Sequence, residues 1–294
     1  MWNYVIPHFN AFLANLTLTP NQQSDIATKV ESVGRCLYSR YYDGLYDSAK
    51  ALVVGSHGKS TAIRPVSDID VLFIMPVEHY YRVNGMQSNG QSYLLQEIRR
   101  EMLSTFSKTD LSADGQVVVA PFTSCMVEVV PAFVCNNGSY ITCNTTDGGS
   151  WRSTNPMAEF QAIARMDTAS CGKATHLIKM LKAWKRNCNV DLKSIVLEIA
   201  VCAFVSQWEY RAETIFYYDW MVRDFFEFFS RYGNGTAQIP GINETLDLGD
   251  DWLSKCMSAY NRALKACEFE YNDLPILSED EWKKIFGDQF VRAL

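Results

Sequence analysis

The sequence predicts an α+β fold, in which a sheet-containing domain is followed by a helical domain. Before residue 155, short apolar runs of strand length alternate with segments of helical pattern. From Asn155 onward the pattern is helical, and the run "SIVLEIAVCAFVSQW" is apolar almost all round, which is typical of a central buried helix. We therefore assign 1–165, including the N-terminal helix, to the sheet domain and 166–294 to the helical domain.

In the first half, Thr19 and Pro20 predict the start of a helix that runs to about Tyr42, because Thr19 can cap it and Gln22 can complete a capping box. A second helix is expected near Tyr93–Thr105. The expected strands are 51–54, 68–75 and the runs "QVVVAPF" and "CMVEVVPAF". The segment 135–150 is rich in Asn, Gly, Ser and Thr, which predicts a loop.

In the second half, "KATHLIKMLKAWKRN" carries Leu177, Leu181 and Trp184 at helical spacing. Two more helices are expected near 214–231 and 250–267, with a loop at 233–241 between them. The run "SEDE" from Ser278 predicts a capping box that opens a last short helix.

The composition is that of an ordinary globular protein, with 48% hydrophobic and 20% charged residues among 294. We expect neither a membrane span nor a signal peptide, because no apolar run reaches the required length and the start lacks a basic region. Nine scattered cysteines without a C-x-x-C pair suit reduced thiols in the cytoplasm. A net charge of −6 argues against a protein that mainly coats nucleic acid.

Two carboxylates, Asp68 and Asp70, begin the apolar strand "DIDVLFIM". Residues two apart on a strand share a face, so these carboxylates repel each other unless a cation lies between them. Glu128, in "MVEVVPAF", is a third candidate if its strand lies beside the first. Such oxygen ligands suit Mg²⁺, and two ions about 3.5–4 Å apart form a clamp for phosphoryl or nucleotidyl displacement. Taken singly, the Asp pair also fits a solvated strand end, and Glu128 fits a paired or edge residue.

Gly55 and Ser56 follow the first short strand, where small residues and free backbone N–H groups can wrap a phosphate. Gly58 and Lys59 follow in the same turn. A strand, Gly-Ser, about a dozen residues, Asp-x-Asp on a strand and a later acidic strand together indicate a nucleotidyltransferase.

These motifs resemble those of the cGAS/DncV-like nucleotidyltransferases, bacterial enzymes that make cyclic oligonucleotides. The resemblance lies in "GSHGKSTAIRPVSDIDVLFI", in "VEVVPAF" and in "LIKMLKAWKRN" followed by "LKSIVLEIAV". The ending "EDEWKKIFGDQF" resembles members of clades C and D that work beside HORMA-type regulators. The family resemblance implies a polymerase β-like mixed-sheet catalytic core and a helical domain that closes the active-site cleft. Glu128 departs from the Asp of many members, which keeps the charge on a longer arm.

The resemblance implies that Asp68, Asp70 and Glu128 are catalytic and hold two Mg²⁺ ions, for which Mn²⁺ can substitute. The residues expected to bind the nucleotide are Gly55, Ser56, Lys59, Ser67, Lys182 and Ser194.

A basic row on the helical segment supports the same expectation. Lys179, Lys182 and Arg186 fall on one helix face, where they suit either solvent or a triphosphate. Glu198, in the apolar helix, is expected to be a structural partner for a basic residue rather than a catalyst.

The expected function is a cyclic oligonucleotide synthase of anti-phage (CBASS) signalling that joins ATP or other nucleoside triphosphates and releases pyrophosphate. By resemblance, the product is expected to be a cyclic tri-adenylate or a related cyclic di- or trinucleotide. A HORMA-domain activator is an expected partner, and double-stranded DNA is a weaker candidate because of the net charge. The alternatives are transfer of a nucleotide to an RNA end or a small acceptor, and an inactive nucleotide-binding module.

Overall fold

The computed structural model describes residues 4–66, 68–214 and 217–291. The chain divides into two compact units. The sheet unit comprises Leu18–Ala62 and Val66–Ala158, and the helical unit comprises Met1–Thr17, Ile63–Pro65 and Glu159–Leu294. The helical unit thus takes the N-terminal segment as well as the C-terminal half, which differs from the continuous division at residue 165.

The sheet unit contains a mixed sheet, as the resemblance implies, and seven strands form it within the described residues. Its main path is β1-β2-β5-β4-β3, and β6 joins β5 to β7. Strands β2 and β5 are parallel, whereas the other neighbours are antiparallel. The strands are β1 Ala51–Val53, β2 Ile69–Ile74, β3 Ser112–Asp114, β4 Val117–Pro121, β5 Met126–Val134, β6 Tyr140–Asn144 and β7 Ser150–Thr154.

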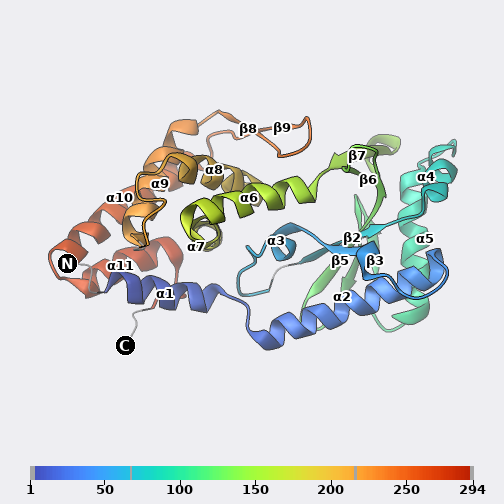
Figure 1. Ribbon diagram of the computed structural model, residues 1–294, viewed down its shortest axis with the longest axis horizontal. Helices are drawn as coiled ribbons and strands as arrows, with labels where there is room; N and C mark the ends of the chain where they lie inside the picture. The colour runs from blue at the N-terminus through green and yellow to red at the C-terminus, as the bar shows by residue number, and fades with distance from the viewer. Residues whose placement is uncertain (1–3, 67, 215–216, 292–294) are drawn as a thin grey trace. The chain divides into compact units, whose positions relative to one another are not determined.

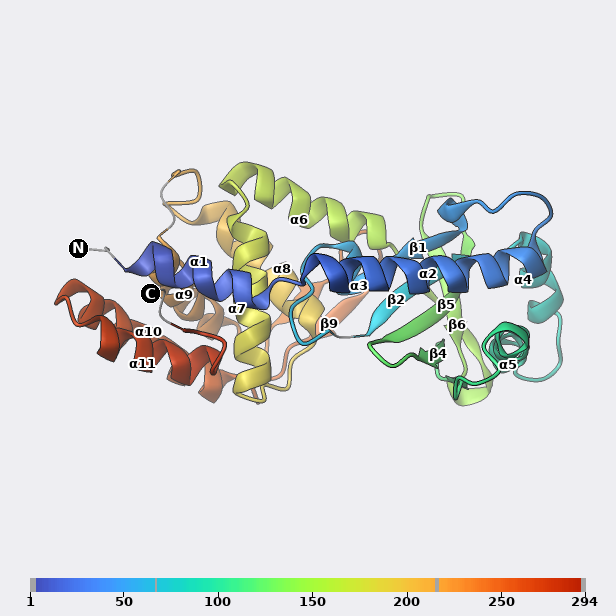
Figure 2. The same ribbon diagram turned by 90° about the horizontal axis from the view of Figure 1, so that it is seen from below.

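Helices α2 (Pro20–Tyr41) and α5 (Gly90–Thr105) pack on one face of this sheet (Figures 1 and 2). The predicted capping box is present, since the Thr19 hydroxyl accepts from the Gln22 N–H and the Gln22 side chain accepts from the Thr19 N–H. The face under these helices carries apolar side chains of β2 and β5 that are fully buried. These are Ile69, Val71, Phe73, Val127 and Val129. Helix α4, Val77–Asn84, and the one-turn helix α3, Gly55–Gly58, complete the unit.

The predicted loop at 135–150 is wrong, because β6 lies within it. Tyr140, Ile141 and Thr142 are β-favouring residues that pair with the far end of β5. The Asn and Gly residues at 136–138 form the turn before this strand, in which Gly138 has a φ of 79°. The backbone N–H of Cys135 donates to the carbonyl of Ser139 across that turn.

Two further boundaries differ from the sequence prediction. The expected loop at 233–241 contains β8 (Thr236–Gln238), which forms a hairpin with β9 (Thr245–Asp247). The last helix, α11, begins at Pro275 rather than at Ser278, because proline already suits the first helical turn. Ser278 is a buried residue inside that helix.

The helical unit is built around an aromatic core. Trp184, Phe225, Phe229 and Trp252 are almost inaccessible to solvent. Helix α8 buries seven of its 14 residues, so the predicted burial holds for part of the helix and not all round. Among the described residues, no helix is long and apolar enough to span a membrane. The helices are α1 Val5–Leu16, α6 Pro156–Ser170, α7 Lys173–Asn187, α8 Ser194–Gln207, α9 Tyr218–Phe229, α10 Leu253–Tyr271 and α11 Pro275–Phe286, and short 3-10 turns lie at Ser48–Lys50, Thr146–Gly148 and Ser230–Tyr232.

A buried lysine anchors the start of helix α7. Lys173 is 1% exposed, and its ammonium group donates to the backbone carbonyls of Ser170, Arg211 and Glu213. Burying an ammonium group is costly unless it is hydrogen-bonded, and these three acceptors satisfy all three of its protons. Lys173 thereby connects α7 to the segment that precedes α9.

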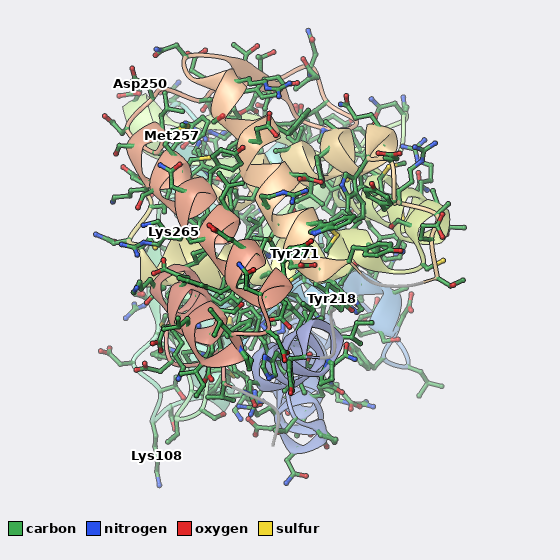
Figure 3. The ribbon with its side chains drawn as sticks, turned by 90° about the vertical axis from the view of Figure 1, so that its left-hand side faces the viewer. Lys108, Tyr218, Asp250, Met257, Lys265 and Tyr271 are labelled. Atoms are coloured by element: carbon green, nitrogen blue, oxygen red, sulfur yellow. The ribbon has the colours of Figure 1, made fainter. Side chains whose placement is uncertain are left out.

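We predict that Lys173→Met lowers the free energy of unfolding by about 2–4 kcal/mol, because the carbonyls lose charged donors while the site stays buried. Lys265→Met, at an exposed position of α10 labelled in Figure 3, is the matched control. Thermal unfolding followed by calorimetry compares the two variants. Equal stability of both variants would show that Lys173 contributes nothing beyond a surface lysine.

Candidate functional site

Two of the three predicted carboxylates lie directly beside each other in the sheet. Asp70 of β2 and Glu128 of β5 are register partners, and their strands run parallel. Directly opposed residues on neighbouring strands share a face and lie about 4.8 Å apart. The condition set by the sequence, that the two acidic strands are neighbours, is therefore met.

Asp68 lies immediately before β2, two residues before Asp70. Ile69 and Val71 are fully buried under the helices, whereas Asp68 and Asp70 are half-buried. This alternation places Asp68 and Asp70 on the sheet face opposite α2 and α5, as the spacing predicts. That face therefore carries both carboxylates in a partly dehydrated setting.

The two aspartates act electrostatically on Glu128. Burial raises the pKa of the Glu128 carboxyl, and the negative charges of Asp70 and Asp68 raise it further. Both effects disfavour the ionised form of Glu128. A cation among the three would reverse the effect of the neighbouring charges, so the site is electrostatically suited to a positive ligand.

The chemistry of these donors fits Mg²⁺, which prefers carboxylate oxygens. Within the described ranges, however, no group of three or more His, Cys, Asp and Glu side chains is already arranged to hold a metal ion. The assignment of two Mg²⁺ ions, or Mn²⁺ in their place, stays a prediction.

Gly55 lies closely against Asp70 of strand β2. Its φ is +58°, and a Cβ on this residue would lie 1.9 Å from Oδ2 of Asp70. The backbone N–H of Val54 also donates to the carbonyl of Asp70, at 2.9 Å. Only glycine adopts this backbone conformation readily and leaves room for the carboxylate. The Gly-Ser turn and Asp70 are thus fixed to each other.

The turn continues as the single helical turn α3. The N–H groups of Gly55 and Ser56 have no carbonyl within their own helix to bond to, which is the usual state of a first turn. The carbonyls of Val54 and Gly55 accept from Gly58 and Lys59. Lys59 is buried and Ser56 is half-buried. This geometry suits a phosphate-binding turn next to Asp70.

The remaining residues predicted to bind the nucleotide do not lie in the Gly-Ser turn. Ser67 lies outside the described residues. Ser194 is the first residue of α8, and Lys182 lies on α7, both in the helical unit. Their part in binding a triphosphate stays a prediction.

Lys182 forms a buried ion pair with Glu198 of helix α8. The Lys182 Nζ lies 3.1 Å from Glu198 Oε1, and both side chains are less than 10% exposed. The expectation that Glu198 is a structural partner for a basic residue is confirmed. The sequence did not identify Lys182 as that partner, although a single acid in an apolar helix signals that some cation must lie nearby.

The other two residues of the basic row are Lys179 and Arg186. Arg186 donates to the carbonyl of Arg64 at 2.6 Å, and burial lowers the pKa of the Lys179 ammonium group. On the opposite face, Leu177, Leu181 and Trp184 are fully buried, as predicted. The row is therefore a partly buried surface rather than a fully solvated one.

We predict that Gly55→Ala destabilises the sheet unit by more than the ~1 kcal/mol cost of a positive φ, because its Cβ overlaps the Asp70 carboxylate. Gly115→Ala is the matched control, since Gly115 has a φ of +63° and open space around its Cβ. Calorimetric unfolding of both variants separates the cost of the positive φ from the cost of the overlap with Asp70. Equal losses of stability would mean that Asp70 moves aside at no cost.

Comparisons with known proteins identify the family of this chain. Residues 4–166 match the model of the SMODS family, described as the Second Messenger Oligonucleotide or Dinucleotide Synthetase domain. A probable cyclic nucleotide synthase from Bacillus cereus is 23% identical over 287 residues, which cover 84% of this chain and 83% of the relative. A cyclic AMP-AMP-AMP synthase from Acinetobacter sp. is 21% identical over 294 residues, with 92% and 83% covered.

Solved structures share the fold over nearly the whole chain. Vibrio cholerae DncV cyclic AMP-GMP synthase, in complex with the linear intermediate 5′ pppA(3′,5′)pG, has a TM-score of 0.76 at 11% identity, with 99% of this chain and 97% of that chain covered. The Escherichia coli MS115-1 CdnC:HORMA-deltaN complex gives a TM-score of 0.69 at 16% identity, with 98% of each chain covered. Since the family model spans more than half of the sequence, the chain belongs to the SMODS family of second messenger synthetases, within the cGAS/DncV-like nucleotidyltransferases.

Proposed function

We propose that this protein makes a cyclic oligonucleotide from ATP or other nucleoside triphosphates and releases pyrophosphate. The observation that supports it most is the pairing of Asp70 with Glu128 directly beside the Gly55 turn, in a member of a second messenger synthetase family. An acidic pair and a phosphate-binding turn on neighbouring strands suit a reaction at the α-phosphate of a nucleotide.

In the proposed reaction, the 3′- or 2′-hydroxyl of one nucleotide attacks the α-phosphorus of another. The hydroxyl loses its proton, an O–P bond forms, and the bond to the departing pyrophosphate breaks. A second attack within the linear intermediate closes the ring. Bound divalent cations would lower the pKa of the hydroxyl and offset the charge of the leaving group.

The protein's own residues would orient these groups. Gly55 and Ser56 offer backbone N–H groups to the donor phosphates. Asp68, Asp70 and Glu128 would hold the cations, and their partly dehydrated setting strengthens each charge interaction. Lys59 follows the turn directly, and Ser67 directly precedes Asp68. In this proposal both residues contact the same phosphates.

The product proposed is cyclic tri-adenylate, which rests on the similarity to the Acinetobacter cyclic AMP-AMP-AMP synthase. A HORMA-domain activator is proposed from the similarity to the CdnC:HORMA-deltaN complex. A role in anti-phage signalling and any response to double-stranded DNA are also proposals, and the resemblance of the sequence is their support.

The product test uses α-labelled triphosphates, supplied singly and in pairs with Mg²⁺, followed by phosphatase treatment. A cyclic product has no terminal phosphate, so its label survives phosphatase, and product mass then gives the ring size. ATP alone should suffice. Products whose label is lost to phosphatase would limit the enzyme to linear oligomers.

The same experiment addresses the alternative functions. Labelling that requires an added RNA or small acceptor would establish a transferase of another kind. No product under any condition would favour an inactive nucleotide-binding module, which the presence of all three carboxylates argues against.

We predict that Asp70→Asn reduces synthesis by at least about 100-fold, the scale seen when a group that stabilises the transition state is removed. Apo stability should stay unchanged or rise, because Asn removes the repulsion with Glu128. Asp110→Asn, at an exposed position of the same unit, is the control. Initial rates and calorimetry test both expectations, and normal turnover of Asp70→Asn would refute the catalytic assignment.

The Lys182–Glu198 pair calls for a charge-based test. Truncating Lys182 alone would leave Glu198 buried and unpaired, so a loss of affinity would be ambiguous. We predict that Glu198→Gln tightens binding of a non-hydrolysable ATP analogue several-fold, because Lys182 keeps its charge without a competing carboxylate. Calorimetric titration measures this affinity, with Lys185→Ala as the control on the same helix. An unchanged affinity for Glu198→Gln would remove Lys182 from the triphosphate site.

A further inference from the structure

A small cavity in the helical unit is surrounded by positive side chains. Its volume is about 230 Å³, and it lies between the end of α7, helix α10 and helix α11. Three of the side chains that line it are cationic, and a hydroxyl and a thiol line it as well. These residues are Lys255, Ser258 and Arg262 of α10, Lys284 of α11, and Cys188 at the end of α7.

The positive charges exceed the negative charges that contact them. Glu281 accepts from Lys284 at 2.5 Å and from Arg262 at 3.3 Å, so one carboxylate serves two cations. Lys255 donates to the backbone carbonyl of Asn189, a neutral acceptor. Three cations and one carboxylate leave a formal charge of +2 at the cavity.

The positive charges act on the Cys188 thiol in the cavity wall. Burial raises the pKa of the Cys188 thiol, while the positive charges of Arg262 and Lys255 act in the opposite direction. Helices α10 and α11 thus direct three cations toward one small volume, and the end of α7 adds the thiol. Cations placed this closely repel each other unless an anion joins them.

We propose that this cavity binds a phosphoryl dianion, either inorganic phosphate or the phosphate of a small monoester. The dianion matches the formal charge of +2, Arg262 offers a fork of donors, the lysines act as point charges, and Ser258 adds a hydroxyl donor. The site lies outside the proposed catalytic carboxylates and does not depend on the proposed function.

The size of the cavity limits the ligand. A volume of 230 Å³ corresponds to about seven or eight water molecules at roughly 30 Å³ each, which is enough for a phosphate group. It is below the ~300–1,000 Å³ typical of pockets that enclose a drug-sized ligand. A larger molecule would therefore place its phosphate in the cavity and its remainder in solvent.

A bound dianion would join three helices. Asn187 at the end of α7 already donates to the carbonyls of Lys284 and Ile285 in α11, at 3.2 and 3.1 Å. The anion would strengthen the links that Lys255 and Arg262 of α10 already make to Asn189 and Glu281. Occupancy should therefore raise the stability of the helical unit.

The test compares Lys255→Met and Lys284→Met, singly and together, with Lys265→Met. Lys265 lies on the same helix as Lys255 but does not line the cavity, so it controls for the loss of one surface charge (Figure 3). The probes are sodium phosphate and AMP, each in metal-free buffer and compared with sodium chloride at equal ionic strength. Calorimetric titration gives the affinity, and thermal unfolding gives the stabilisation.

We expect phosphate to bind the wild type and Lys265→Met equally, and to bind each cavity variant at least about ten-fold more weakly. If AMP shows the same dependence on Lys255 and Lys284, the site accepts a monoester; if only phosphate does, the ligand is inorganic phosphate. General salt effects raise the stability of every variant alike. An equal response of all variants to phosphate would therefore overturn the proposal, and Lys284→Met alone keeps the test valid if the double variant fails to fold.

Discussion

The contact between Gly55 and Asp70 constrains the candidate site more than any other interaction in the sheet unit. A single methyl group on residue 55 would overlap the carboxylate, so strand β2 and the turn after β1 must be positioned together. The hydrogen bond from Val54 to the carbonyl of Asp70 fixes the same relation through the backbone. The Gly-Ser turn and the acidic strand therefore form one rigid element, as a site that positions reacting groups requires.

Much of the fold follows from the sequence where periodicity and end signals agree. Helix α2 begins at its capping box, and β2 is buried at Ile69 and over 71–73, as its apolar run predicts, with Asp70 half-buried. The alternation also places Asp70 on the face away from the helices, and the register with Glu128 then completes the pair. Composition gives a wrong prediction where a turn and a strand adjoin, because Asn and Gly near residue 138 are typical of a loop and the short strand β6 follows them directly.

Other features depend on contacts that sequence spacing does not encode. Helix α1 packs its phenylalanines against the rings of α11, so the two ends of the chain share one core. Phe9 contacts Trp282 and Phe290, nearly the full sequence length away. The partner of Lys182 is another such case, since the helix period identifies its face but not the acid that α8 supplies. Distant pairings of this kind require the folded structure.

The sheet topology has a consequence for the order in which the site forms. Asp70 and Glu128 are adjacent in space but nearly sixty residues apart in sequence, and their strands are parallel. Closing such a loop costs chain entropy before the pairing compensates for it, so these contacts form late in folding. The Gly-Ser turn and Asp70 can meet as soon as β1 and β2 pair, whereas the third carboxylate arrives only with β5. During synthesis, a chain that has emerged only as far as α5 therefore carries an incomplete acidic site.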